Sequence, residues 1–156
     1  MKTEVADTDE WQNVVPTLES LVSFPLYAAA KETVKLYRPL LDGLNLTYTQ
    51  YIAMVVFWEH KKLNVKELGE RVFLDSGTLT PVLKSLEAKG YVRRYRSTED
   101  ERVLFVEVTE LGDSLKERAP ELSREMVSRM MVSLSHDEFR TLYHLLYKLL
   151  DGIKND

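Results

Sequence analysis

The chain of 156 residues contains no cysteine. This absence excludes disulfide bonds, thiolate chemistry and metal sites with cysteine ligands. The longest unbroken apolar run, residues 51–58, is far shorter than the roughly 20 residues that a helix needs to cross a bilayer, so no membrane partner is expected. The first ten residues carry four carboxylates and no apolar stretch follows them, which argues against a signal peptide and for a cytoplasmic protein.

Charge is distributed unevenly along the chain. The formal net charge of −4 argues against a nonspecific coat for nucleic acid. Residues 76–96, however, contain five lysines and arginines against Glu87 alone, which gives a local charge of +4. Local charge matters more than the total where a protein meets a polyanion, so this segment is a candidate DNA contact.

Helical signals dominate the first half of the chain. Apolar residues three and four positions apart predict a first helix that opens at Pro16-Thr17 and is interrupted at Pro25 and Pro39. Capping-box patterns at Thr47–Gln50 and Asn64–Glu67 predict the starts of two more helices. The first of these boxes precedes a nearly all-apolar run, so that helix is expected to be central and buried.

The next segments have the size and spacing of a helix-turn-helix with a wing. Asp75-Ser76 is a predicted cap for a helix over 77–89, and Gly90 suits a left-handed helix end. Alternating residues then predict strands over Tyr91–Arg96 and Val103–Thr109 around a polar turn. The predicted fold is therefore mainly α with a small β-wing, a winged helix-turn-helix.

The last third returns to helix, with residues 111–131 expected to bend near Pro120. A third capping box at Ser135–Glu138 begins a final helix. Its apolar stripe is wide for the edge of a monomer, which predicts dimerisation through Leu142, Leu146 and Leu149. We therefore expect one domain over 1–156, with a helical dimerisation region (18–45 and 111–153) and a winged helix-turn-helix DNA-binding region (47–109).

Residues suited to DNA contact gather on the second helix of the helix-turn-helix and on the wing. Short hydroxyls at the helix start can reach base edges or phosphates, and the free N–H groups there favour a phosphate. Arg102 on the wing suits a narrow minor groove, with Asp100 holding its guanidinium. The predicted contacts are Ser76, Thr78, Thr80, Lys84, Arg94, Asp100 and Arg102, with Lys89 also placed to reach the DNA backbone.

Ordinary structural roles compete with these assignments. Ser76 is equally suited to be only a helix cap, and Thr78 and Thr80 to be solvated positions. Arg93, Arg94 and Arg96 together would also make an ordinary exposed strand face. No nucleophile–base pair, phosphate-binding glycine loop or paired carboxylates appear, so an enzyme is not expected. The three histidines are scattered, so neither a metal nor another cofactor is predicted.

The order of elements and several strings resemble the MarR family of winged-helix regulators, in particular its organic-hydroperoxide-sensing OhrR type. The resemblance runs from about Leu18 to Ile153. The most specific string is 74–81, Leu-Asp-Ser-Gly-Thr-Leu-Thr-Pro. Further matches are Tyr-Arg-Pro-Leu-Leu at 37–41, Leu-Thr-Tyr-Thr-Gln-Tyr at 46–51, Val-Lys-Glu-Leu-Gly-Glu at 65–70 and Asp-Glu-Arg at 100–102.

The resemblance implies a homodimer on double-stranded DNA with a near-palindromic operator, most often as a repressor. It also implies a reactive cysteine near the start of the first helix, where this chain has Ser23, with supporting tyrosines at Tyr27, Tyr37 and Tyr48. Serine does not undergo peroxide oxidation, so the chain is expected to stay in the reduced-like, DNA-binding form. Either a cysteine was replaced by serine to freeze that form, or a natural regulator has lost thiol sensing.

Three functions follow as hypotheses. The first is a regulator of the organic-hydroperoxide type. The second is a MarR-type repressor relieved by a small aromatic or phenolic ligand between the dimer helices and the winged region. The third is a winged helix used only for protein contact, which the +4 segment disfavours. Pro25, in the string 22–27, departs from the family pattern and puts the local geometry around Ser23 in question.

Overall fold

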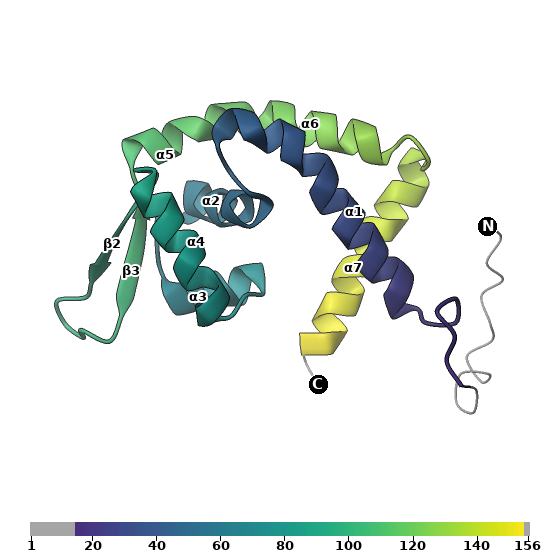
Figure 1. The fold of residues 1–156 in the computed structure, drawn as a ribbon, viewed down its shortest axis with the longest axis horizontal. Coiled ribbons are helices and arrows are strands. Elements are labelled where there is room, and N and C mark those ends of the chain that lie inside the picture. Colours follow the sequence, from purple (N-terminus) through teal and green to yellow (C-terminus); the bar gives the residue numbers. More distant parts are fainter. Residues whose placement is uncertain (1–14, 155–156) are drawn as a thin grey trace.

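The computed structural model describes residues 15–154, and it is mainly helical with a small antiparallel sheet, as the sequence predicts. Figure 1 shows an arch, in which α1, α6 and α7 form one arm and α2, α3, α4 and the β2–β3 wing form a compact lobe. The elements are α1 (Ser23–Leu41), a 3-10 turn (Asp42–Leu44), α2 (Tyr48–His60), β1 (Lys62–Asn64), α3 (Val65–Val72), α4 (Ser76–Ala88), β2 (Val92–Arg96), β3 (Leu104–Val108), α5 (Glu110–Ser114), a 3-10 turn (Leu115–Arg118), α6 (Ala119–Met130) and α7 (His136–Lys154).

Helix α2 is the centre of the lobe, which confirms the prediction of a buried helix after the first capping box. Ala53, Met54 and Phe57 are fully buried. They belong to one cluster with apolar side chains of α3, of α4 and of the sheet: Leu68, Leu79, Leu83, Leu86, Val92 and Val106. Burial of this apolar area is the main force that holds α4 against the lobe, because each large aliphatic side chain contributes about 1.5–3 kcal/mol when it is fully buried.

All three predicted capping boxes are present. Thr47 and Gln50 bond reciprocally at the start of α2, and Asn64 and Glu67 do so at the start of α3. Ser135 and Glu138 exchange the same pair of bonds before α7. Gly90 ends α4 with φ 75°, and the N–H groups of Gly90 and Tyr91 donate to the carbonyls of Glu87 and Leu86. This closed pattern satisfies two carbonyls at the helix end, as the sequence predicts.

The start of α1 differs from the prediction. The helix begins at Ser23 rather than at Pro16-Thr17, because Thr17 and Ser20 bond each other in a separate turn. Pro25 therefore lies in the first turn of α1, where the missing N–H has no helical partner to lose, and it causes no interruption. Pro39 lies inside α1, which continues past it to Leu41.

Two further details were not predicted. The three-residue strand β1 pairs antiparallel with β3, with Leu63 opposite Val106, and completes a sheet of order β1-β3-β2. The segment after the wing is divided into α5, a 3-10 turn and α6, and the division falls just before Pro120 rather than at a bend in one helix. Over residues 15–154, no helix is long and apolar enough to cross a membrane.

Candidate nucleic-acid interface

The turn between α3 and α4 is tightly packed. Phe73 takes a left-handed conformation with φ 57°, and the N–H groups of Phe73 and Leu74 both donate to the carbonyl of Gly69. A Cβ atom on Gly69 would lie 2.6 Å from the carbonyl oxygen of Leu74, so only glycine fits there. The turn therefore fixes the direction in which α4 leaves α3.

Asp75 caps the N-terminus of α4. Its carboxylate accepts from the backbone N–H of Thr78 at 2.9 Å and from the Thr78 hydroxyl at 2.8 Å. These two bonds hold the pKa of Asp75 below its ordinary value. The interpretation of Ser76 as the cap is therefore wrong. The carboxylate takes the Thr78 N–H, one of the groups that the sequence suggested for a phosphate.

The three hydroxyls predicted to contact DNA lie on exposed parts of α4. Thr78 donates its hydroxyl hydrogen to Asp75, and Thr80 donates its own to the carbonyl of Ser76 at 2.7 Å. Both threonine oxygens keep free lone pairs and can still accept hydrogen bonds from outside. The side chain of Ser76 makes no hydrogen bond within residues 15–154, so it can donate as well as accept.

The two lysines of this helix face different surroundings. Lys84 is exposed and forms no ion pair with the described part of the chain. Lys89 turns inward, where its ammonium donates to the carbonyl of Asn45 at 2.6 Å and to the amide oxygen of Gln50 at 2.9 Å. Burial lowers the pKa of Lys89. Lys89 therefore connects α4 to the junction of α1 and α2, and its expected contact with DNA backbone is not supported.

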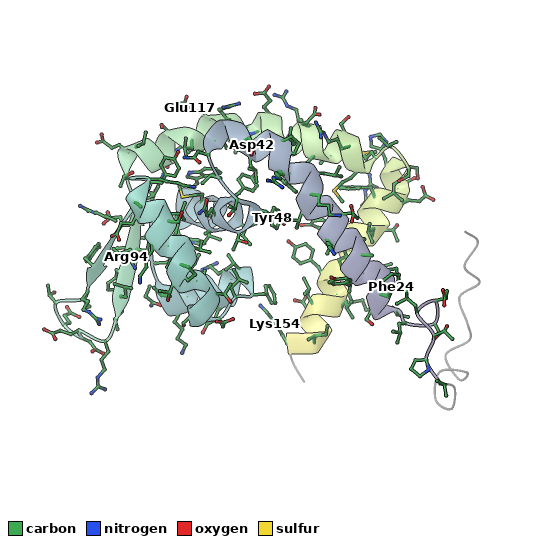
Figure 2. All side chains as sticks on the ribbon, in the orientation of Figure 1. Phe24, Asp42, Tyr48, Arg94, Glu117 and Lys154 are labelled. Carbon is green, nitrogen blue, oxygen red and sulfur yellow. The ribbon has the colours of Figure 1, made fainter. Side chains whose placement is uncertain are left out.

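Arginines of the wing are largely paired within the protein. Arg94 donates two hydrogen bonds to one carboxylate oxygen of Glu87, at 2.6 and 2.8 Å, and its side chain is only 20% exposed. Figure 2 shows Arg94 between the wing and α4. Arg93 pairs with Glu107 at 2.7 Å on the opposite face of the sheet. The local charge of +4 already includes Glu87, and Glu107 beside Arg93 lowers it further. A phosphate contact by Arg94 would compete with the Glu87 pair.

At the tip of the wing, Asp100 accepts a hydrogen bond from the backbone N–H of Arg102 at 3.0 Å. The sequence prediction that Asp100 holds the guanidinium of Arg102 is therefore wrong, because the carboxylate shapes the turn instead. The Arg102 guanidinium forms no ion pair with residues 15–154 and the side chain is exposed. Among the predicted contacts, Arg102 and Lys84 are thus the cations placed to meet a polyanion.

The predicted sensor residues separate into two groups in one chain. Ser23 and Tyr27 are exposed near the start of α1, whereas the rings of Tyr37 and Tyr48 lie 4.9 Å apart near its other end. Tyr51, which sequence reasoning missed, extends the pair at 5.8 Å from Tyr37. Burial raises the pKa of Tyr37 to about 12. Fourteen residues of helix separate Ser23 from Tyr37, or roughly 21 Å at about 1.5 Å per residue. In Figure 2, Phe24 lies near the start of α1, well away from Tyr48.

Comparison with known proteins assigns the family. Residues 35–119 match the family of SarA/Rot transcriptional regulators. The organic hydroperoxide resistance transcriptional regulator of Bacillus subtilis is 45% identical over 136 residues, which cover 87% of this chain and 91% of that protein. The chain is a winged-helix regulator of the SarA/Rot and MarR type. The HTH-type transcriptional regulator SarZ of Staphylococcus saprophyticus is 43% identical over 134 residues, or 85% of this chain and 92% of that protein.

A solved structure of mutant MarR from E. coli complexed with operator DNA has the same fold, with a TM-score of 0.75 and 25% identity over 83% of this chain and 93% of that one. The chain is accordingly a DNA-binding transcriptional regulator of the MarR/OhrR type and not an enzyme. Over residues 15–154, no group of three histidine or acidic side chains is arranged to hold a metal ion.

In helix α7 of this MarR-type regulator, no residue is buried in the single chain. Leu142 is 38% exposed and Leu149 is 45% exposed, and Leu146 between them is half-buried. Leu145, Leu150 and Ile153 extend the exposed apolar surface. An exposed area of this kind along a whole helix favours a protein partner, so dimerisation through Leu142, Leu146 and Leu149 stays a prediction.

Proposed function

We propose that this regulator is a homodimeric repressor that binds a near-palindromic operator, with α4 in the major groove and the wing in the minor groove. One observation carries the proposal. Helix α4 buries Leu79, Leu83 and Leu86 in the lobe, while Ser76, Thr78, Thr80 and Lys84 all lie on its exposed surface. Two such helices related by a two-fold axis would read half-sites about 34–36 Å apart, which explains the expected near-palindrome.

The test is selection of duplexes from a random pool by the purified full chain. A DNA-reading dimer enriches sequences with two-fold symmetry, and its affinity falls steeply with salt because bound phosphates release counterions. The variant Thr80→Ala, with a matched control Ser128→Ala on the far α6, tests the helix face. Enrichment of no sequence, with a flat salt dependence, would instead support the protein-contact module.

We further propose that Ser23 occupies the sensing position of the hydroperoxide type. In one chain, Ser23 lies too far from Tyr37 and Tyr48 for a shared pocket, so the proposed pocket forms only between two chains. This requirement links sensing to the dimer: a change at position 23 would alter how the arms meet. Serine lacks a reactive thiolate, and the chain would therefore hold its DNA under peroxide whether the serine is natural or a replacement.

The variant Ser23→Cys tests the sensor. The thiolate sulfur would attack the outer oxygen of cumene hydroperoxide and the O–O bond would break. The sulfur would keep the hydroxyl as a sulfenic acid, and the alkoxide would leave as the alcohol after it takes a proton from water. Phenol hydrogens donated to the thiolate would lower the thiol pKa below about 8.5. We expect operator binding to weaken after peroxide in Ser23→Cys only. An ordinary thiol pKa and peroxide-indifferent binding would contradict this part of the proposal.

A second candidate is relief by a small aromatic carboxylate. A groove of about 480 Å³ between the arm and the lobe is lined by Arg38, Tyr48 and Lys89, among others. The Lys89 ammonium contacts only neutral oxygens, and Arg38 forms no ion pair with residues 15–154, so both cations can accept an anion. Calorimetric titration with sodium benzoate tests this candidate. Binding that disappears in Arg38→Gln supports it, and absence of heat in both proteins rejects it.

A further inference from the structure

Phe73 is a large aromatic residue at a position of the turn that does not favour one. Its φ of 57° places the backbone in the left-handed region. Glycine and asparagine adopt this conformation readily, whereas a residue with a bulky side chain does so only at a cost in energy. The residue is also 52% exposed, so burial in the core does not compensate for the backbone. An aromatic ring held outward at an unfavourable backbone position suggests that the ring itself has a partner.

The partner comes from the arm of the arch, at the end of α7. Lys154, the last residue of α7, places its ammonium 4.1 Å from the centroid of the Phe73 ring. A cation within about 6 Å of a ring face is attracted by the π-electrons. Figure 1 shows α7 descending across the open side of the arch toward α3, and Figure 2 places Lys154 at that end. Glu70 and Asp75 line the same groove and add negative charge near the ammonium.

Phe73 is coupled through the turn to the start of α4. Asp75, two residues further on, is the cap of α4. The intervening Leu74 is bonded back to Gly69, whose lack of a side chain allows the close approach of the turn. Because the turn is rigid, a displacement of the Phe73 ring would be transmitted to the N-terminus of α4 instead of being absorbed.

We propose that Lys154 and Phe73 are positioning residues for DNA binding. Their contact ties the end of the arm helix α7 to the turn of the helix-turn-helix and so sets the orientation of α4 relative to the arm. The cation–π geometry explains why an exposed aromatic occupies position 73, and the end of α7 explains why a cation is available there. The effect on DNA affinity rests on the proposed operator binding, whereas the contact itself does not.

The experiment is a double-mutant cycle on the selected duplex, with Lys154→Gln, Phe73→Leu and the two together. Leucine keeps a Cβ atom and hence the backbone penalty, so only the ring is lost. We expect each single variant to bind DNA about two- to five-fold more weakly, as an exposed cation–π contact predicts. The double variant should bind DNA no more weakly than the weaker-binding of the two single variants. Lys154→Arg and Phe73→Tyr should restore affinity, and the control Lys148→Gln on the same helix should leave it unchanged.

Two readouts separate this proposal from the proposed function. An upfield ring-current shift of the Lys154 side-chain protons in NMR, lost in Phe73→Leu, reports the contact without DNA. Because the chain has no cysteine, a spin label attached at Ala88→Cys is the only label on each chain. It reports the distribution of distances between the two α4 helices of a dimer, and this distribution should broaden in Lys154→Gln. Additive losses of affinity, or a ring-current shift that is absent, would overturn the proposal. A chain that selects no duplex would contradict the proposed function. The NMR shift would then show by itself whether the contact between Lys154 and Phe73 exists.

Discussion

Replacement of Arg94 by alanine separates a structural role from a DNA contact. Arg94 donates two side-chain hydrogen bonds and one backbone hydrogen bond to Glu87, which joins β2 to α4. Hydrogen bonds to charged groups contribute about 1.5–3 kcal/mol each when they are shielded. The Glu87 side chain is 37% exposed, so solvent screening reduces the total. We therefore expect Arg94→Ala to lower the free energy of unfolding by about 1–2 kcal/mol.

Urea denaturation measures the stability, and salt titration on the selected duplex measures phosphate contact. A lost phosphate contact reduces the slope of log K against log salt by about 0.9, whereas a structural role leaves the slope unchanged. Glu87→Gln is the complementary variant, since it breaks the pair but keeps Arg94 available to DNA. Arg93→Ala, which breaks the exposed pair with Glu107, is the control and should change stability little.

The pH dependence gives an independent check. The Arg94 side chain holds the pKa of Glu87 below its ordinary value. A lowered carboxyl pKa contributes stability above the unfolded pKa of about 4.3, and this contribution is lost as pH falls through the folded value. The stability difference between the parent and Arg94→Ala should therefore shrink on acidification below about pH 4.3. An unchanged free energy of unfolding together with a reduced salt slope would refute the reasoning and restore the DNA contact.

Three other substitutions test separate parts of the molecule. Arg102→Ala should weaken operator binding by about 1–3 kcal/mol without a change in melting temperature, measured by mobility shift and calorimetry; unchanged affinity would exclude the minor-groove role. Leu146→Glu should yield a monomer that no longer binds DNA, because a charge would be buried against the partner, and a dimer in sedimentation would place the interface elsewhere. Asp75→Ala should lower the melting temperature and Asp75→Asn should recover it, because asparagine also caps helices; equal losses would reject the capping role.

Local sequence patterns predict the element starts well. Each capping box depends on four consecutive residues, and the Gly90 helix end depends on one backbone conformation. The boundary of α1 was mistaken because Pro25 is compatible both with an interrupted helix and with a first turn. Strand β1 was missed because three residues carry no period, and only pairing with β3, forty residues later, makes them a strand.

Charge roles were the least predictable part of the candidate site. Whether a lysine faces solvent or the interior depends on residues far away in sequence, as Lys89 and its partners Asn45 and Gln50 show. The same holds for Arg94, whose partner lies on α4. The sequence identifies a cationic segment, but only the packing separates cations that hold the lobe together from those, such as Lys84 and Arg102, that remain available.

The ties on α4 bear on how a signal could reach the DNA. Near the C-terminal end of the helix, Lys89 bonds to the α1–α2 junction and Glu87 pairs with Arg94 of the wing, whereas Asp75 bonds to Thr78 of α4 itself. With two polar ties to neighbouring elements and a buried apolar face, α4 cannot rotate within the lobe without breaking the Glu87–Arg94 ion pair and the hydrogen bonds of Lys89. This packing favours movement of the lobe as one unit, so the junction of α1 with α2 and the end of α7 are the contacts to test for an effect on DNA affinity.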